Sequence, residues 1–274
     1  MRTSIAGRSS TDHAEQINAM EHPKITRLYK YFDKYERVID ILTTGRIYYP
    51  KPDKLNDPFD CNIDIISSVS SDQFEQRIRS EGEELNKKAE EVEQKIRSLR
   101  SEGGAAIGGY ETRVKEGIKQ VRRTLKQQGV LCLSTISDSI PMWSHYAKGH
   151  EGICIELRRR PENVLGSTAT RQVRYVHAYP EVSWADLFES PGLLSETVMY
   201  TKSKKWKNEQ EWRVFLTNGN ILGNLPGDIT GILFGLRTLK EHKCEIARLA
   251  RNKGIDLRQA VKVPRYFQIG FVKY

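Results

Sequence analysis

Cysteine is scarce and widely spaced in this chain of 274 residues. The cysteines stand at positions 61, 132, 154 and 244 and form no Cys-x-x-Cys pair. That spacing argues against a zinc knuckle or a dense disulfide scaffold and favours a reducing compartment. Long apolar runs are also missing, since a stretch such as Ile229–Leu236 is far too short to cross a bilayer. The N-terminus lacks the apolar core of a secretory signal, so we expect a cytoplasmic protein.

Several common catalytic motifs are absent as well. The sequence contains no Gly-x-Gly-x-x-Gly turn, no Gly-Lys-Ser/Thr phosphate loop, no His-Glu-x-x-His and no Gly-x-Ser-x-Gly. His145 and His150 are close in sequence, but Gly149 breaks the helical spacing that would place two metal ligands on one face. Histidines that orient a loop are the favoured interpretation, and we expect no bound metal.

Positive charge is in excess. Lysine and arginine number 44 against 35 aspartates and glutamates, which gives a net charge of +9. This favours an anionic partner such as nucleic acid, a nucleotide or an acidic protein acceptor. The alternative is a basic surface that serves only solubility.

The hydrophobic periodicity predicts one α+β domain with a mixed or antiparallel sheet. Residues 1–23 are polar and aperiodic, so we expect a flexible tail followed by a single domain over residues 24–274. Apolar residues recur at helical spacing on both sides of Ser101–Gly104, which predicts an antiparallel helical hairpin inserted at residues 71–128. The expected strands are Thr26–Phe32, Arg46–Pro50, Val130–Leu133, Gly152–Leu157, Arg171–Val176, a strand from Glu211, Ile229–Phe234, Gln259–Val263 and Phe267–Val272. The expected helices are Tyr35–Thr44, Pro141–Ala147, Leu193–Lys205 and Thr238–Asn252.

Two glutamates beside an arginine mark the strongest candidate for a working site. From Glu211 onward, alternation places Trp212 on one face of the expected strand and Glu211 and Arg213 on the other. Glu209 would join that second face if the strand began early enough. Two like charges side by side must face water, pair with a cation or bind a ligand. Arg213 could also simply be the structural partner of Glu211.

Other candidate residues combine aromatic rings with mixed charge. Aromatic faces stack flat rings, basic side chains hold phosphates, and a carboxylate can stabilise an oxocarbenium ion. The alternative is that the aromatic residues are core and the charged residues form surface pairs. Asn56 and Asp57 precede Pro58 in a segment whose chemistry is that of a turn. The candidates for binding are Tyr29, Lys30, Tyr31, Asn56, Asp57, Trp143, Ser144, His145, Tyr146 and Arg213.

Short motifs in a fixed order give the chain a family resemblance. The motifs are Leu28-Tyr-Lys-Tyr31, Asn56-Asp-Pro-Phe-Asp60, Met142-Trp-Ser-His-Tyr-Ala147, His150-Glu-Gly-Ile-Cys-Ile155, Val173–Tyr175, Lys202–Trp206, Glu209-x-Glu-x-Arg213 and Ile232–Gly235. Together they resemble the bacterial "domain of unknown function 2971" family over nearly the whole chain outside the tail and the hairpin. Their order and residue types also resemble, more distantly, the ADP-ribosyltransferase superfamily.

The second resemblance implies a donor site for NAD. Lys30 would grip the donor where that superfamily has arginine or histidine, although lysine offers a point charge in place of a planar fork. Ser144 or Tyr146 would support the nicotinamide pocket. Glu211 would be the catalytic glutamate, and Glu209 would activate the acceptor.

These observations lead to one hypothesis and two alternatives. The hypothesis is an ADP-ribosyltransferase-like enzyme that cleaves NAD and modifies a protein or nucleic acid, in a toxin or antiviral-defence role. The first alternative is a metal-dependent nuclease with Asp57, Asp60, Glu209 and Glu211 around Mg²⁺. The second is a non-catalytic module that binds nucleotides or nucleic acid through the basic arm of the hairpin.

Overall fold

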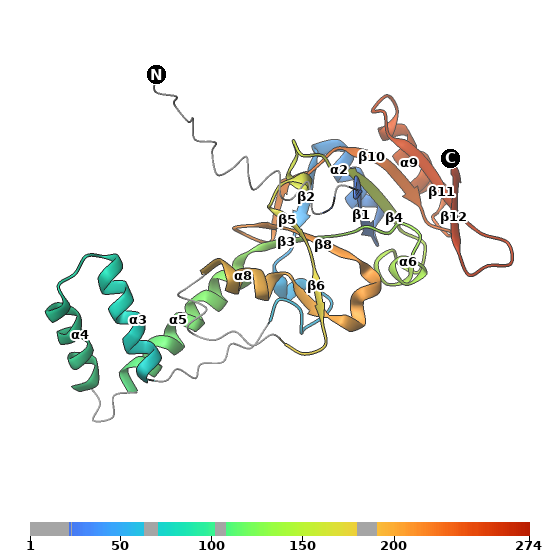
Figure 1. Cartoon of the computed structure of the whole chain (residues 1–274). Helices are drawn as coiled ribbons and strands as arrows, with labels where there is room; N and C mark the ends of the chain where they lie inside the picture. The colour runs from blue at the N-terminus through green and yellow to red at the C-terminus, as the bar shows by residue number, and fades with distance from the viewer. Residues whose placement is uncertain (1–21, 23, 63–70, 102–107, 180–190) are drawn as a thin grey trace, which may run out of the picture. The chain divides into compact units, whose positions relative to one another are not determined.

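The α+β class expected from the sequence is confirmed by a computed structural model of the chain (Figure 1). The structure describes residues 22, 24–62, 71–101, 108–179 and 191–274. Almost all of the tail expected at residues 1–23 lies outside these residues. The chain divides into two compact units. Unit 1 comprises residues 1–51, 129–173 and 205–274, and unit 2 comprises residues 52–128 and 174–204.

Unit 1 is built on an eight-stranded mixed sheet with the strand order β12-β11-β10-β4-β1-β3-β8-β5. Its strands are β1 (Arg27–Phe32), β3 (Gly129–Ser134), β4 (Ile153–Arg158), β5 (Thr170–Gln172), β8 (Glu211–Leu216), β10 (Ile229–Phe234), β11 (Asp256–Lys262) and β12 (Ile269–Lys273). Within the part of the chain that the structure describes, β10 and β11 pair in parallel and the other neighbouring strands of this sheet pair antiparallel. A separate antiparallel ribbon joins β2 (Arg46–Tyr49) to β9 (Ile221–Asn224).

The two faces of the large sheet carry different helices. Alternate side chains such as Leu28, Ile155 and Trp212 form the main core on one face, where α2 (Tyr35–Thr44) and α9 (Lys240–Ala250) pack. We call this the core face. On the opposite face, which we call the site face, α6 (Ile140–Tyr146) packs through a smaller cluster of buried residues. That cluster consists of Tyr31, Met142, Trp143, Ala147, Cys154, Leu233, Ala260 and Ile269.

Local sequence signals set the ends of α2 as expected. Gly45 adopts a left-handed conformation with φ of 67° and donates its N–H to the carbonyl of Ile41 at 2.9 Å. A side chain with a Cβ would be strained there, so glycine ends the helix at low cost. The predicted helix over Tyr35–Thr44 is therefore confirmed.

The helical hairpin expected at residues 71–128 differs from the structure of this segment in unit 2. The described residues between 71 and 128 form three helices in place of two arms, namely α3 (Ser71–Glu84), α4 (Ala89–Ser101) and α5 (Gly108–Gln127). The first arm breaks because Asn86 has a positive φ of 51° and the N–H of Lys87 turns back to the carbonyl of Gly82 at 2.8 Å. Ile78 on α3 then packs on Val92 and Ile96 of α4. Helical periodicity alone does not predict this break between α3 and α4.

Two further expectations change in the structure. The strand expected over Arg171–Val176 ends at Gln172, and β6 (Arg174–Val176) pairs in parallel with β7 (Thr201–Ser203) in unit 2. The helix expected over Leu193–Lys205 is α8 (Pro191–Met199), followed by β7 and the short 3-10 helix η3 (Lys204–Glu209). The remaining short helices are η1 (Pro52–Lys54) and η2 (Val164–Gly166).

The helices that the structure describes include none that is both long and apolar enough to span a membrane.

Candidate functional site

The two glutamates of the motif Glu209-x-Glu-x-Arg213 are held in different ways. Strand β8 begins at Glu211, while Glu209 ends η3. Gln210 between them has a left-handed φ of 45°. The chain therefore turns between the two carboxylates, and strand alternation does not extend back to Glu209. Each carboxylate has its own partner.

Glu211 forms a two-pronged ion pair with Arg213. The guanidinium donates from Nε to Oε1 at 2.7 Å and from Nη2 to Oε2 at 3.1 Å. Arg213 is 0% exposed and Glu211 3% exposed, and both lie on the site face. Fork-shaped contacts of this kind are among the strongest hydrogen bonds in proteins and fix the carboxylate's orientation.

Glu209 is held by α6 and by strand β3. The hydroxyl of Tyr146 donates to Oε1 of Glu209, a side chain that is 4% exposed. Ser134 Oγ donates to the backbone carbonyl of Glu209 at 2.6 Å and accepts from the N–H of Ile136 at 3.0 Å. Ser134 also lies directly opposite Glu211 in the ladder between β3 and β8. One serine thus positions the backbone around both carboxylates. We call Ser134, Tyr146, Glu209, Glu211 and Arg213 the carboxylate site.

Helix α6 contributes a buried anchor and an exposed end. Ser139 caps its first turn by accepting from the N–H of Met142 at 3.4 Å. Trp143 is fully buried, donates from Nε1 to the carbonyl of Ser137 at 2.7 Å and meets Tyr31 edge-on at 5.3 Å. Tyr31 is also buried. These two rings are therefore packing residues with no open face for a ligand ring.

The exposed end of α6 carries Ser144 and His145. Ser144 Oγ donates to the carbonyl of Ile140 at 2.9 Å and lies 3.3 Å from Nε2 of His150. Burial, followed by the nearby charge of Arg237, lowers the pKa of His150 below its usual 6.5. His150 is accordingly neutral near pH 7 and stacks parallel to Trp143 with 6.3 Å between ring centroids. The role in orienting the loop after α6, which its sequence context favoured, stays a prediction.

Lys30 lies on the other side of the sheet from the carboxylate site. Tyr29 pairs with Ser134, and Ser134 with Glu211, so these three share the site face. Lys30 follows Tyr29 on the strand and points to the core face. Its Nζ donates to the carbonyl of Cys132 at 3.0 Å. The structure therefore does not bring Lys30 to the carboxylates, although it does bring Tyr29 and Tyr31 to their face.

Asn56 and Asp57 belong to unit 2. Asp57 accepts from the N–H of Phe59 at 2.9 Å, so the predicted turn is confirmed. Asp60, at the end of that turn, lies 3.4 Å from Nζ of Lys202, and both side chains are buried. Two motifs that are far apart in the sequence thus meet in one buried ion pair.

Glu156 on β4 is a site residue that the sequence reasoning missed. It is 2% exposed and accepts from Thr230 Oγ1 at 2.7 Å, Arg258 Nη2 at 2.6 Å and the hydroxyl of Tyr29 at 3.3 Å. Arg27 adds an ion pair at 3.4 Å. These residues form the Glu156 cluster. The signal was present, because an acid interrupts the otherwise apolar run Ile153–Leu157.

A glycine makes the Glu156 cluster possible. Arg258 stands on β11, two strands away from Glu156, with β10 between them. Gly231 on β10 faces both Glu156 and Asp256 in the ladders. A Cβ at Gly231 would lie 2.7 Å from Nη2 of Arg258, so the missing side chain is what lets the arginine cross.

The site face therefore carries two separate carboxylate clusters. The ladder runs from Glu211 through Ser134 and Tyr29 to Glu156. With neighbouring strands spaced at about 4.8 Å, the backbones of Glu211 and Glu156 are about 14 Å apart.

We expect Glu156→Gln to destabilise unit 1 in a pH-dependent way. Burial alone would raise the pKa of Glu156, but hydrogen bonds from Arg258 and Thr230 outweigh it and lower the pKa below 4.5. The unfolded chain therefore takes up this proton first as the pH falls. The stabilisation is present above about pH 4.5 and is lost as the pH drops through the folded pKa.

Urea unfolding at several pH values measures this effect. At pH 7 the free energy of unfolding of the variant should be about 2 kcal/mol lower than that of the wild type, because a neutral amide replaces a carboxylate that accepts hydrogen bonds with both oxygens. The difference from the wild type should shrink as the pH falls below about 4.5 and through the lowered pKa of Glu156. A difference that stays constant with pH would contradict the assigned role of Glu156.

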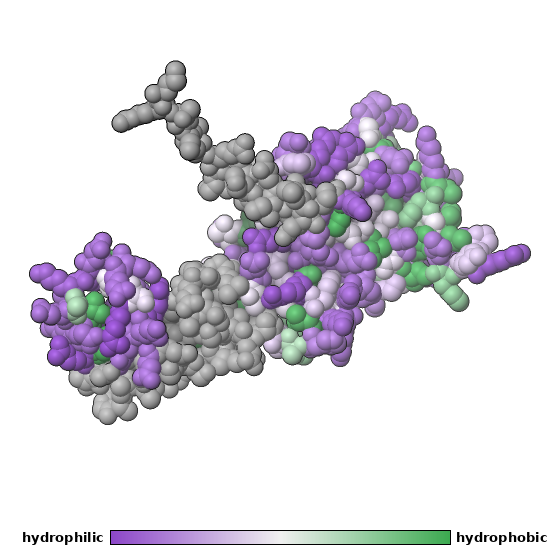
Figure 2. Space-filling view, in the orientation of Figure 1, coloured by the Kyte–Doolittle hydropathy of each residue, from purple (hydrophilic) through white to green (hydrophobic). Residues whose placement is uncertain are grey.

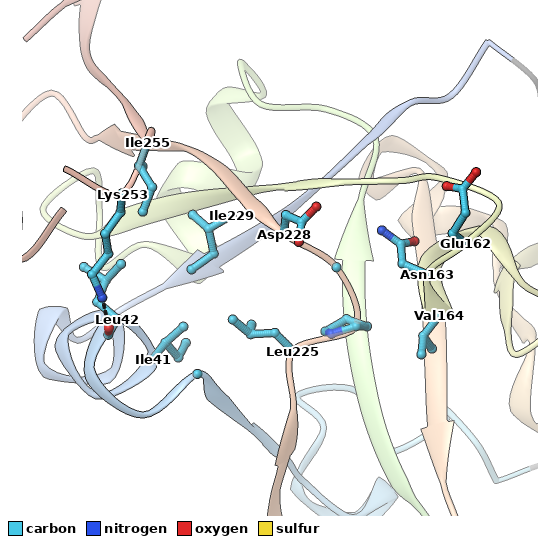
Figure 3. Close-up of a pocket in the computed structure, with 13 residues that line it drawn as sticks. Ile41, Leu42, Glu162, Asn163, Val164, Leu225, Asp228, Ile229, Lys253 and Ile255 are labelled. Atoms are coloured by element: carbon cyan, nitrogen blue, oxygen red, sulfur yellow. Dashed lines mark hydrogen bonds between the residues drawn. The ribbon is translucent and has the colours of Figure 1, made fainter. Parts of the chain in front are cut away.

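A cavity of about 560 Å³ opens elsewhere in unit 1 (Figure 3). It has an apolar floor that includes Ile41, Leu225 and Ile229, with Lys253 at one end and Glu162 at the other. Lys253 Nζ donates to the carbonyl of Leu42. The cavity is lined by none of the residues singled out from the sequence.

The nuclease alternative needs several carboxylates around one ion. Within the residues described by the structure, no group of three or more histidine, cysteine, aspartate or glutamate side chains could hold a metal. The four carboxylates of that alternative therefore gain no support as a ligand set.

Comparisons with known proteins bear on the central part of the chain. Residues 142–214 match the model of a family described as "Protein of unknown function (DUF2971)". Searches of curated proteins and of solved structures found no match. The matched residues run from α6 through β4 to β8, and so contain most of the carboxylate site together with Glu156. Over this segment the chain is therefore similar to the DUF2971 family.

Proposed function

We propose that the carboxylate site is the active site of an ADP-ribosyltransferase-like enzyme. In this proposal the enzyme cleaves the bond between nicotinamide and ribose in NAD and passes ADP-ribose to a protein or nucleic acid. The observation that supports it is the pair of buried carboxylates, Glu209 and Glu211, fixed by separate partners beside the exposed end of α6. Buried carboxylates with fixed orientations are frequent at active sites.

The two carboxylates can take different chemical roles. As nicotinamide leaves, positive charge develops on the ribose, and a carboxylate beside it lowers the barrier. Glu211, aligned by Arg213, is assigned to that charge. Glu209, aligned by Tyr146, is assigned to accept the proton of the attacking acceptor group. The proton thus moves to Glu209 as the acceptor forms its bond to the ribose carbon.

The residues around the site fit an NAD molecule only in part. His145 is exposed, whereas Tyr146 is half-buried and packs against the cluster beneath α6. The rings of Trp143 and Tyr31 are buried and pack against each other, and the side chain of Lys30 points to the core face. Phosphate binding by Lys30 is therefore left out of the proposal.

The test is transfer of label from NAD. Wild-type protein, cell extract and NAD labelled in the adenylate should give labelled macromolecules and free nicotinamide. We expect Glu211→Gln to lower the rate about 100-fold, as the loss of one group that stabilises transition-state charge does. Tyr146→Phe removes one hydrogen bond to a charged group and should lower the rate about tenfold.

A matched control separates chemistry from folding. Glu241→Gln removes an exposed acid of α9 and should leave the rate unchanged. Each variant's circular dichroism and urea midpoint are recorded beside its rate. No label transfer and no nicotinamide release by the wild type would overturn the proposal, as would full activity of both Glu209→Gln and Glu211→Gln.

A further inference from the structure

The strands β11 and β12 form a hairpin (Figure 1), and the loop between them carries two exposed aromatic rings. Phe267 is 103% exposed and Tyr266 71% exposed. The loop itself is held in place, because the N–H of Val263 donates to the carbonyl of Gln268 at 3.0 Å and the N–H of Tyr266 donates to Val263 at 3.2 Å. Two neighbouring rings are thus presented to solvent on an ordered support. A fully exposed phenylalanine forgoes about 2 kcal/mol of burial energy.

After Asp256, the first residue of β11, the same hairpin carries only basic charges. From residue 257 to residue 274 the sequence contains no aspartate or glutamate. Lys262, Arg265 and Lys273 on this hairpin are all exposed. Figure 2 shows hydrophobic and hydrophilic residues mixed on the side of the molecule that carries β12 in Figure 1. Rings and cations therefore occur together without a neutralising acid in the segment.

We propose that this hairpin tip, residues 262–268, binds single-stranded nucleic acid. Bases stack on the faces of Tyr266 and Phe267, and the phosphates of the strand pair with Lys262 and with Arg265. The partner that fits is an anionic chain carrying flat, apolar rings, since those are the two features the tip complements. Unpaired bases are required because rings inside a duplex are not open to stacking.

Two other occupants fit less well. A second copy of the chain would bring two basic tips together, and like charges at short distance repel. A lipid surface would attract the cations, but Arg265 and Gln268 flank the rings and would have to enter the apolar layer with them. The binding experiment distinguishes both of these occupants from nucleic acid.

This inference does not depend on the proposed transferase, and its experiment contains no NAD. Full-length protein is titrated into fluorescein-labelled 20-nucleotide oligouridine and oligothymidine, with fluorescence anisotropy as the readout. The variants are Tyr266→Ala/Phe267→Ala and Arg265→Ala. The matched control is Leu222→Ala, which trims a side chain on β9 that is 48% exposed.

Loss of stacking should dominate the result. At about 1 kcal/mol for each base stacked, the double ring variant should bind about 30-fold more weakly than the wild type. Arg265→Ala should weaken binding and lower the slope of log affinity against log salt by about 0.7, the value for one phosphate contact on a single strand. Leu222→Ala should bind like the wild type.

Several outcomes would overturn the inference. One is no saturable binding of either oligonucleotide at 50 mM salt, and another is equal binding by the ring variant and the wild type. Vesicles of phosphatidylcholine and phosphatidylserine form a further arm. Ring-dependent sedimentation with vesicles, without oligonucleotide binding, would assign the tip to lipid. A ring-dependent dimer in light scattering, again without oligonucleotide binding, would assign it to a second copy of the chain.

Discussion

Arg213→Met should lower the free energy of unfolding by about 4 kcal/mol, in the range measured when one partner of a buried ion pair is removed. The change deletes both hydrogen bonds that the guanidinium donates to Glu211. The Glu211 carboxylate then remains 3% exposed in the fold without that cation. Methionine retains most of the arginine's volume, so the loss reports charge and hydrogen bonding more than packing.

The double variant Arg213→Met/Glu211→Leu provides the control. Replacing both partners with apolar side chains removes the buried charge as well, and much of the lost stability should return. Urea unfolding followed by circular dichroism measures both proteins. A single variant that loses less than about 1 kcal/mol would show that the pair behaves as an exposed one. In that case the buried geometry of the carboxylate site would be wrong.

Trp143→Ala should cost about 3–5 kcal/mol, the usual price of deleting a buried tryptophan. Trp143 is fully buried, its Nε1 donates to Ser137, and its ring edge meets Tyr31. Truncation opens a cavity beneath α6 and leaves the Ser137 carbonyl without this donor. Because α6 also carries Tyr146, we expect the hydrogen bond to Glu209 to loosen as well.

The same unfolding assay tests this expectation against Leu222→Ala, which trims a side chain that is already 48% exposed. That control should change stability by less than about 0.5 kcal/mol. Equal stabilities for Trp143→Ala and the control would contradict the position of α6 on the site face.

The sequence was most informative where structure is decided locally. The helix Tyr35–Thr44 and its end at Gly45 follow from an apolar stripe and a left-handed glycine, and both are found in the structure. Strands such as β1, β4 and β10 also occur within a residue or two of the predicted ranges. The break at Val173 was missed, because residues 171–176 have the composition of one strand although β5 and β6 pair in different sheets.

The candidate site was less predictable because its geometry depends on which strands pair. Alternation alone places Lys30 and Tyr29 on opposite faces, but only the ladder through Ser134 tells which of them shares a face with Glu211. The partners of Glu156 depend on the strand order, which makes β10 the neighbour of both β4 and β11. The left-handed backbone conformation of Gln210 cannot be predicted from the residue types alone.

Gly231 gives the chain a position where a non-polar change would alter an acid–base property. Alanine there would place a Cβ 2.7 Å from Arg258 and push the guanidinium off Glu156. Glu156 would then lose the first of the hydrogen bonds that hold down its pKa, while its burial remained. A single methyl group on β10 could thus tune the charge state of a carboxylate on the next strand, without replacing any ionisable residue.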